Sequence, residues 1–213
     1  MTAITSRGLQ IPQSLAEMLA PRTTALIVYD MQVGVLGQIA DADCVIRQVR
    51  RLLDGARAAG LRILFTRHMS LPPALMGVMQ YRTAMAWQRV DDPDQVRPWF
   101  LPDSTGFQLV PALAPTADEA VLDKLAMSAF EGTPLSLILR DCGVTTVLFC
   151  GVATEVGIEP SLRHAADLGF IPILAADACG AGHAEAAARS LEALRFSGDA
   201  VISDVDSILA AFG

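Results

Sequence analysis

The stretch VTTVLFCGVATEVGIEPSLRHAADLG, residues 144–169, decides the fold class of this chain. Its first part is an apolar run that predicts a buried strand over residues 144–151. A turn of small residues follows, and the pattern after it predicts a helix over residues 159–169. Pro160 falls in the first turn of that helix, where proline is tolerated. A buried strand, a tight turn and a helix together form the repeating unit of a parallel α/β sheet.

The same alternation extends along the rest of the chain. Further short apolar runs predict strands at residues 23–30, 61–68, 119–124, 170–178 and 199–204. The helices predicted between them cover residues 44–60, 133–143 and 183–198, and a last short helix ends the chain. Continuous apolar strands of this kind occur in parallel sheets covered on both faces, so we predict a three-layer α/β/α fold. Because no internal repeat or linker interrupts the pattern, we expect one domain over residues 1–213.

Two segments fall outside this alternation. Residues 1–21 lack the basic start and apolar block of a signal peptide, and we expect them to form an arm on the domain or on a neighbouring subunit. Residues 69–118 contain seven prolines and follow the end of a predicted strand. Long insertions at such places are more often functional than structural, so we interpret this segment as a lid or binding loop.

Composition and charge indicate which kinds of molecule the chain can bind and which environment suits it. The chain has 213 residues, of which 52% are hydrophobic and 18% charged, so it has enough apolar residues for a sizeable core. A net charge of −7 argues against nucleic acid and anionic membranes as partners. The four cysteines form no CxxC pair, which argues against a disulfide framework or a zinc site and favours the reducing cytoplasm.

Three polar features come directly after predicted strands. Asp30 ends the run at 23–30, Lys124 ends the run at 119–124, and the turn at 151–157 follows the strand at 144–151. In an open parallel sheet, ligands bind at the carboxyl ends of the strands where the strand order reverses. Asp30 is therefore a candidate general acid or base, an interpretation that we favour over a helix cap or a solvated loop acid. Lys124 acquires a role only if it faces Asp30; otherwise it is a surface lysine.

Several common sites are missing from the sequence. Neither glycine-containing turn matches GxGxxG, no phosphate-binding loop is present, and no GxSxG nucleophile elbow occurs. The three histidines have no metal-ligand spacing, and two of them, His164 and His183, read as ordinary helix residues. We therefore expect neither a cofactor nor a bound metal.

Three stretches taken together resemble the isochorismatase-like hydrolase family, which belongs to the cysteine hydrolase superfamily. They are ALIVYDMQ (25–32), LDKLAMSAFEGTPLSLILRDCGVTTVLFCGVATEVG (122–157) and LRHAADLGFIPILAADACGA (162–181). The resemblance covers roughly residues 22–205 and implies a six-stranded parallel sheet in the order 3-2-1-4-5-6. In that order the first and fourth strands flank the switch point, so Asp30 and the turn at 151–157 would face one crevice.

The resemblance also assigns the site residues. In the amidase branch of the family an aspartate, a lysine and a cysteine act together, and Asp30 and Lys124 match the first two. The cysteine belongs where this chain has Gly157, and Cys150 lies on the strand side of the turn. Without a thiolate at this position no thioester can form. The isochorismatase branch also carries glycine here and cleaves a vinyl ether by protonating it, but its turn reads GVYAH where this chain reads GVATE.

Further roles follow from the same resemblance. A cis peptide is expected at Val152–Ala153, and the backbone N–H groups of Ala153 and Gly157 would form an oxyanion hole. The nicotinamidase metal ligands are not reproduced by TRHMSLPP after the second strand. The candidates for substrate contact are polar or aromatic residues near the predicted strand ends or within the insertion: Gln32, Arg67, His68, Arg82, Trp87 and Arg89. For Trp87, packing of a lid or interface is an equal alternative.

These features leave three functional hypotheses. The first is a metal-independent hydrolase of a small molecule, with Asp30 as the acid or base, Lys124 as its electrostatic partner and no cysteine nucleophile. In another, Asp30 is the general base for water attacking an activated amide or imide. The remaining hypothesis is a degenerate family member that binds a small molecule or acts as an oligomeric scaffold. In each case we expect a homodimer or homotetramer.

Overall fold

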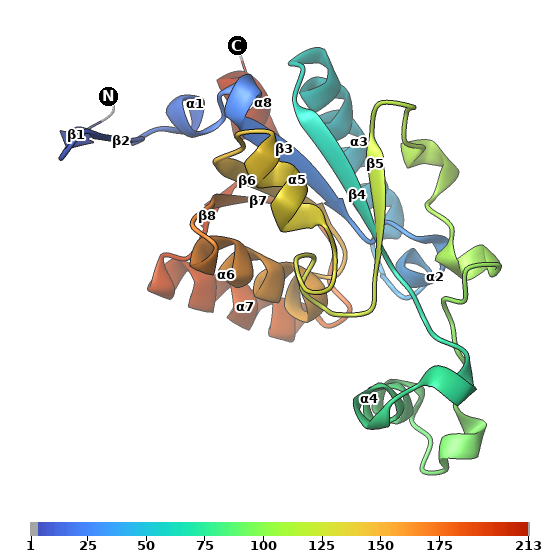
Figure 1. Ribbon diagram of the computed structural model, residues 1–213. Coiled ribbons are helices and arrows are strands. Elements are labelled where there is room, and N and C mark those ends of the chain that lie inside the picture. The colour runs from blue at the N-terminus through green and yellow to red at the C-terminus, as the bar shows by residue number, and fades with distance from the viewer. Residues whose placement is uncertain (1–3, 213) are drawn as a thin grey trace.

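The computed structural model describes residues 4–212 and contains a six-stranded parallel sheet in the order β5-β4-β3-β6-β7-β8 (Figure 1). This confirms the predicted order 3-2-1-4-5-6. The strands are β3 (Thr24–Tyr29), β4 (Arg62–His68), β5 (Ala120–Lys124), β6 (Thr146–Gly151), β7 (Ile171–Cys179) and β8 (Val201–Ser203).

Helices cover both faces of this sheet. On one face the apolar core joins the sheet to α3 (Ala42–Ala58) and α8 (Val205–Ala211). On the other face it joins the sheet to α5 (Leu135–Asp141), α6 (Glu159–Asp167) and α7 (Ala184–Ser197) (Figure 1). The predicted three-layer α/β/α architecture is therefore confirmed.

The apolar pattern explains why these residues form these layers. Every residue of β3 is buried, as expected for a central strand that is covered on both faces. The stripe along α3 is also buried, and it consists of Val45, Val49, Leu52, Leu53 and Ala56. These residues recur at helical spacing, so that one face of α3 rests on the sheet while its charged face is in solvent.

The strand order reverses next to β3. This strand pairs with β4 on one side and with β6 on the other, and the chain then moves outward in both directions. The register aligns Tyr29 with Gly151 and His68 with Lys124, so the carboxyl ends of four strands meet at one edge. This edge is the switch point at which open α/β sheets bind their ligands.

The segment 69–118 departs from the expected loop, because it contains the helix α4 (Val78–Gln88). Figure 1 shows α4 beyond the carboxyl ends of the strands, apart from the three layers. The apolar residues of α4 follow no single stripe, which is why their spacing does not predict a helix. The same segment contains four 3₁₀ turns, at Pro73–Leu75, Pro93–Gln95, Thr105–Phe107 and Pro111–Leu113. A further short helix, α2 (Val33–Leu36), lies between β3 and α3.

The N-terminal segment contains a hairpin that the sequence analysis does not predict. Strands β1 (Ile4–Ser6) and β2 (Leu9–Ile11) pair with each other and extend away from the layers (Figure 1). The helix α1 (Leu15–Met18) and a 3₁₀ turn at Pro21–Thr23 then lead into β3. Within residues 4–212, none of the helices has the length and apolarity needed to cross a membrane.

Candidate active site

A buried ion pair lies at the switch point. The Nζ atom of Lys124 donates a hydrogen bond to Oδ2 of Asp30 at 2.7 Å, and both side chains are almost completely buried. The other carboxylate oxygen of Asp30, Oδ1, accepts a hydrogen bond from the Thr66 hydroxyl at 2.6 Å. Because each carboxylate oxygen accepts a hydrogen bond, one of them from a cation, the ionised form of Asp30 is well solvated by the protein.

Three neighbouring strands position this pair. Asp30 follows β3, Thr66 lies in β4, and Lys124 is the last residue of β5. The backbone of Asp30 has a φ of +46°, a left-handed conformation that is uncommon for a residue with a side chain. Its N–H donates to the carbonyl and hydroxyl oxygens of Thr66, both at 3.2 Å. These bonds hold the strained turn, so Asp30 is positioned by backbone as well as by side-chain contacts.

The turn after β6 lies at the same edge of the sheet. The Val152–Ala153 peptide is cis, as expected. Residues Thr154–Ile158 then form a π-helical turn, and within it the N–H of Gly157 donates to the Ala153 carbonyl at 3.1 Å. The expected oxyanion-hole donor at Gly157 is thus engaged inside the turn. The hydrogen bonds of residues 4–212 leave the Ala153 N–H without an acceptor.

Gly157 faces the side chain of Tyr29. A Cβ atom built on Gly157 would lie 2.0 Å from the Tyr29 hydroxyl oxygen and 2.5 Å from its ring carbon Cζ. Tyr29 is buried and donates its hydroxyl proton to the Met127 carbonyl. Burial, and to a smaller extent the nearby charge of Asp30, raises the pKa of the Tyr29 hydroxyl well above its usual range, so the hydroxyl stays protonated. The Lys124 ammonium lies 4.3 Å from the centre of the same ring.

The cysteines lie elsewhere. Cys150 is fully buried in β6, where burial raises the pKa of its thiol well above the usual range. Burial likewise raises the pKa of Cys179 to about 12. Cys44 and Cys142 are exposed on the surface. None of these four thiols lines the cavity beside Asp30. A buried thiol with a raised pKa is a poor nucleophile, so Cys150 does not replace a side chain at position 157.

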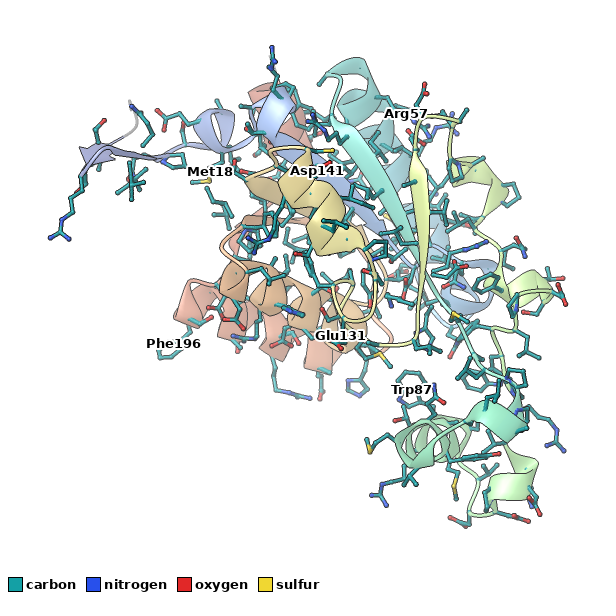
Figure 2. All side chains as sticks on the ribbon, in the orientation of Figure 1. Met18, Arg57, Trp87, Glu131, Asp141 and Phe196 are labelled. Carbon is teal, nitrogen blue, oxygen red and sulfur yellow. The ribbon has the colours of Figure 1, made fainter. Side chains whose placement is uncertain are left out.

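A cavity of about 410 Å³ opens beside Asp30, and we call it the Asp30 cavity. The turn at Ala153 and Gly157 forms one wall, and α4 contributes Trp87 and the residue after its end, Arg89. Figure 2 shows Trp87 on the side of α4 that faces the rest of the molecule. Of the predicted substrate-contact residues, the structure therefore brings His68, Trp87 and Arg89 to this cavity.

The other three candidates lie outside it. Gln32 is buried and its amide is held by the backbone of His68 and Phe107. Arg67 forms an ion pair with Asp123, with Nε 2.7 Å from Oδ1, and its guanidinium lies on the ring of Phe107. Arg82 is exposed on α4 and lines neither this cavity nor the neighbouring one. In this structure none of these three residues lines the Asp30 cavity.

His68 has an unusual environment. Burial, together with the nearby Lys124 charge, lowers the pKa of its imidazole to about 4, so the ring is neutral. Its Nδ1 atom is buried and has no hydrogen-bond partner within the described part of the chain. The same holds for Oε2 of Glu155, whose other oxygen accepts from the His183 N–H at 2.7 Å. Both residues line the Asp30 cavity.

Sequence reasoning missed Tyr29, Thr66 and Glu155. Tyr29 and Thr66 lie inside apolar strand runs, where a tyrosine or threonine reads as an ordinary strand residue. Glu155 lies within the turn at 151–157, and its position two residues before Gly157 was the one available signal. Within residues 4–212, no three histidine, cysteine or acidic side chains gather in a way that would hold a metal ion.

Comparison with known proteins agrees with this fold. Residues 24–206 match the Isochorismatase domain family. An uncharacterized isochorismatase family protein of Escherichia coli O157:H7 is 35% identical over 77% of this chain and 83% of its own length. A ureidoacrylate amidohydrolase of Methylobacterium radiotolerans is 32% identical over 78% of this chain and 70% of its own. The crystal structure of a cysteine hydrolase from Pseudomonas syringae pv. phaseolicola superposes with a TM-score of 0.78 at 24% identity, covering 90% of this chain and 93% of that one.

Proposed function

Because the chain belongs to the isochorismatase family of hydrolases, we propose that it hydrolyses a small molecule through Asp30 and Lys124 without a cysteine nucleophile. The observation that carries this proposal is the buried Asp30–Lys124 pair, because Asp30 lines a cavity that Gly157, a position without a side chain, also lines. The Tyr29 hydroxyl fills the space next to Gly157, so the site is adapted to the absence of a side chain there.

The hydrogen bonds that both carboxylate oxygens of Asp30 accept support general-base catalysis. A water molecule in the cavity would give a proton to the Asp30 carboxylate while its oxygen attacks the carbonyl carbon of an amide or urea. The negative charge on the carbonyl oxygen would be stabilised by the Ala153 N–H. Asp30 would then return the proton to the leaving nitrogen as the C–N bond breaks. Lys124 holds the carboxylate in place through the hydrogen bond of 2.7 Å.

Similarity to the ureidoacrylate amidohydrolases supports a C–N bond as the target, since these relatives are named for cleaving one. Glycine at position 157 supports a second candidate, the hydrolysis of a vinyl ether. In that reaction Asp30 would have to carry a proton and donate it to the enol carbon, after which water adds to the cationic centre. The bonds that the Asp30 carboxylate accepts from Lys124 and Thr66 favour the first reaction, because they stabilise its ionised form.

The test is turnover by Asp30→Asn on a panel of ureas, amides and vinyl ethers. We expect the wild type to hydrolyse members of one class and Asp30→Asn to lose at least about 100-fold in kcat/KM, the range of general acid–base catalysis. Asp123→Asn is the matched control, because it removes a neighbouring carboxylate whose partner is Arg67 and which lines no part of the cavity. Full activity of Asp30→Asn would exclude the proposed role.

A degenerate binding protein is the alternative. If this alternative holds, the wild type will turn over none of the ureas, amides or vinyl ethers, while ligands from the same panel will still raise its melting temperature. The intact ion pair argues against this alternative, because buried charges are costly to keep and are readily replaced by apolar residues when they serve no purpose.

A further inference from the structure

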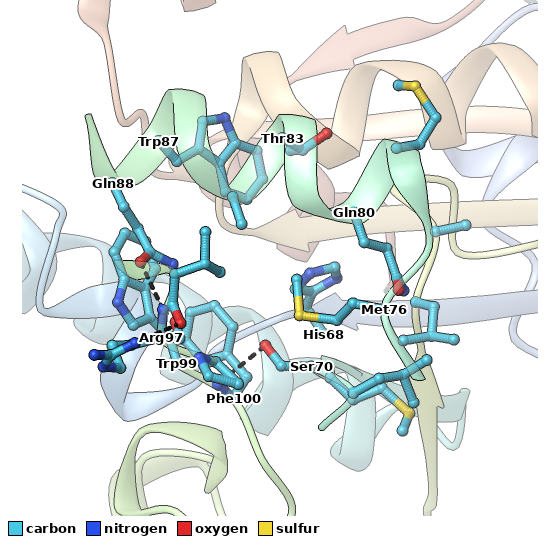
Figure 3. A pocket seen from close by; sticks show the side chains of 18 of the residues that line it. His68, Ser70, Met76, Gln80, Thr83, Trp87, Gln88, Arg97, Trp99 and Phe100 are labelled. Carbon is cyan, nitrogen blue, oxygen red and sulfur yellow. Dashed lines mark hydrogen bonds between the residues drawn. The ribbon is translucent and has the colours of Figure 1, made fainter. Parts of the chain in front are cut away.

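A second cavity adjoins the one beside Asp30. It has a volume of about 260 Å³ and lies between α4 and the segments 68–71, 96–100 and 125–127. We call it the aromatic chamber. Figure 3 shows the His68 ring and Met76 lying between α4 and the hydrogen-bonded residues Ser70 and Phe100. The chamber and the Asp30 cavity are contiguous, because they share five lining residues: His68, Trp87, Trp99, Phe100 and Met127.

The walls of the chamber are suited to a flat apolar group. Both tryptophans of the chain line it, together with Phe100 and four of the eight methionines, Met69, Met76, Met79 and Met127. Aromatic rings offer large flat contact areas, and methionines adapt to the shape of what they contact. A mostly apolar lining with few polar groups is typical of small-molecule sites.

The polar residues in these walls are mostly occupied. The amide of Gln88 is bonded at both ends to the backbone of Arg97. The Ser70 hydroxyl accepts from the Phe100 N–H at 3.2 Å (Figure 3). In contrast, Nδ1 of His68 is buried and has no hydrogen-bond partner within the described residues, and His68 lines both cavities. A buried polar atom without a partner is costly, so a ligand that bridges the two cavities gains a hydrogen bond there.

Glu155 adds a second unpartnered atom on the side of the Asp30 cavity. Its Oε2 is a buried acceptor without a donor. A carboxylate oxygen that faces a ligand selects N–H or O–H groups and rejects groups that carry only acceptors. The head of a ligand in this cavity therefore needs hydrogen-bond donors, while the part beyond His68 needs none.

We propose that the aromatic chamber is a substrate subsite, and that the substrate is a ring-bearing urea or amide. Its N–H-bearing head lies between Asp30 and Glu155, and its ring lies beneath α4. This inference rests on the proposed function for the head group. The ring subsite itself is a statement about binding and is testable without turnover.

The test uses three probes. Phenylurea has both the ring and the N–H groups, methylurea lacks the ring, and acetophenone keeps a ring and a carbonyl but has no N–H. Binding is followed by tryptophan fluorescence, since Trp87 and Trp99 are the only tryptophans and both line the chamber. Calorimetry gives Kd independently. We expect phenylurea to bind at least 10-fold more tightly than either of the other probes.

Two substitutions on α4 make a matched pair. Ala84→Phe fills the chamber, because Ala84 lines it, whereas Val78→Phe adds the same ring at an exposed position that lines neither cavity. We expect Ala84→Phe to weaken phenylurea binding at least 10-fold and to leave methylurea unchanged, and Val78→Phe to change neither. Thr83→Leu, at another lining residue, repeats the test if Ala84→Phe is unstable. Glu155→Gln should weaken phenylurea about 10-fold and leave acetophenone unchanged.

The outcomes separate this inference from the proposed function. Equal affinities for phenylurea and methylurea would overturn the ring subsite, even if the protein hydrolyses small ureas. A ring preference that Ala84→Phe abolishes would support the subsite, even if no urea or amide is hydrolysed and the proposed function fails. If Ala84→Phe instead changes the sedimenting mass and not the affinity, the chamber is an interface between two copies and the inference is wrong.

Discussion

The Tyr29 hydroxyl occupies the space that a side chain at position 157 would need, with 2.0 Å between its oxygen and a Cβ built on Gly157. Restoring a cysteine there is therefore not a neutral change. Gly157→Cys alone should destabilise the fold by about 1–3 kcal/mol, the usual cost of overpacking a core. Urea denaturation measures this loss.

The double variant Tyr29→Val/Gly157→Cys tests the packing relationship directly. Tyr29→Val removes the clashing ring and leaves a cavity, so it also destabilises on its own. Because the new side chain enters that cavity, the double variant should lose less unfolding free energy than the two single variants lose together. The difference should be about 1 kcal/mol or more. Strict additivity of the two unfolding free energies would contradict the assigned contact.

The Asp30–Lys124 pair should show the energetics of a buried ion pair. Lys124→Met leaves the Asp30 carboxylate buried without its cation and should cost about 3–5 kcal/mol in unfolding free energy. Asp30→Asn/Lys124→Met removes both charges and should recover part of that loss. Arg50→Met, which breaks an exposed pair with Asp54, is the control and should cost less than about 1 kcal/mol.

His68 predicts a pH dependence of stability. Its folded pKa of about 4 lies below the ordinary value of 6.5, so between these values the unfolded chain binds a proton that the folded chain does not. The contribution of His68 to the unfolding free energy is therefore complete above pH 6.5, and it is lost as the pH is lowered toward 4. The loss is on the order of 3 kcal/mol, since one pKa unit corresponds to about 1.4 kcal/mol.

Two variants isolate this contribution of His68. His68→Gln should flatten the dependence of the unfolding free energy on pH between 7 and 4, whereas His183→Gln, at an exposed histidine that caps α7, should keep the wild-type slope. Chemical denaturation at a series of pH values measures both. An unchanged slope in His68→Gln would show that the buried imidazole is not responsible.

We propose that the N-terminal hairpin forms the contact between copies in a homo-oligomer. It extends from the layers and exposes Ile4, Leu9 and Ile11, which a second copy of the chain would cover (Figure 1). Changing these three residues to serine should lower the average mass in sedimentation equilibrium. Thr5→Ser/Gln10→Ser alters polar residues of the same hairpin and should leave the mass unchanged. A wild-type mass equal to that of the monomer would contradict the proposal.

Phe196, on the surface of α7 and 95% exposed, is a second apolar site to compare in the same assay (Figure 2).

The sequence by itself determined the sheet and the edge that carries the site. The runs that became β3 and β6 are buried along their whole length, and β4 is buried over residues 63–66, as expected for the central strands of a covered parallel sheet. The polar residues that end such runs, Asp30 and Lys124, were therefore predicted to lie at one edge. Local pattern was sufficient for burial and for parallel strands, which follow from hydrophobic periodicity and from the alternation of strands with helices. The strand order came from the family resemblance.

The tertiary structure decided which side chains meet at that edge. Lys124 reaches Asp30 across 94 positions of sequence, and Thr66 reaches it across 36, because the strand register aligns their ends. Arg67, the residue next to Thr66, points the other way, since successive side chains of a strand alternate between faces. Tyr29 reads as a strand residue in the sequence, and only its packing against Gly157 reveals that it fills the space beside a missing side chain. Such contacts depend on distances between separate elements, which no local pattern encodes.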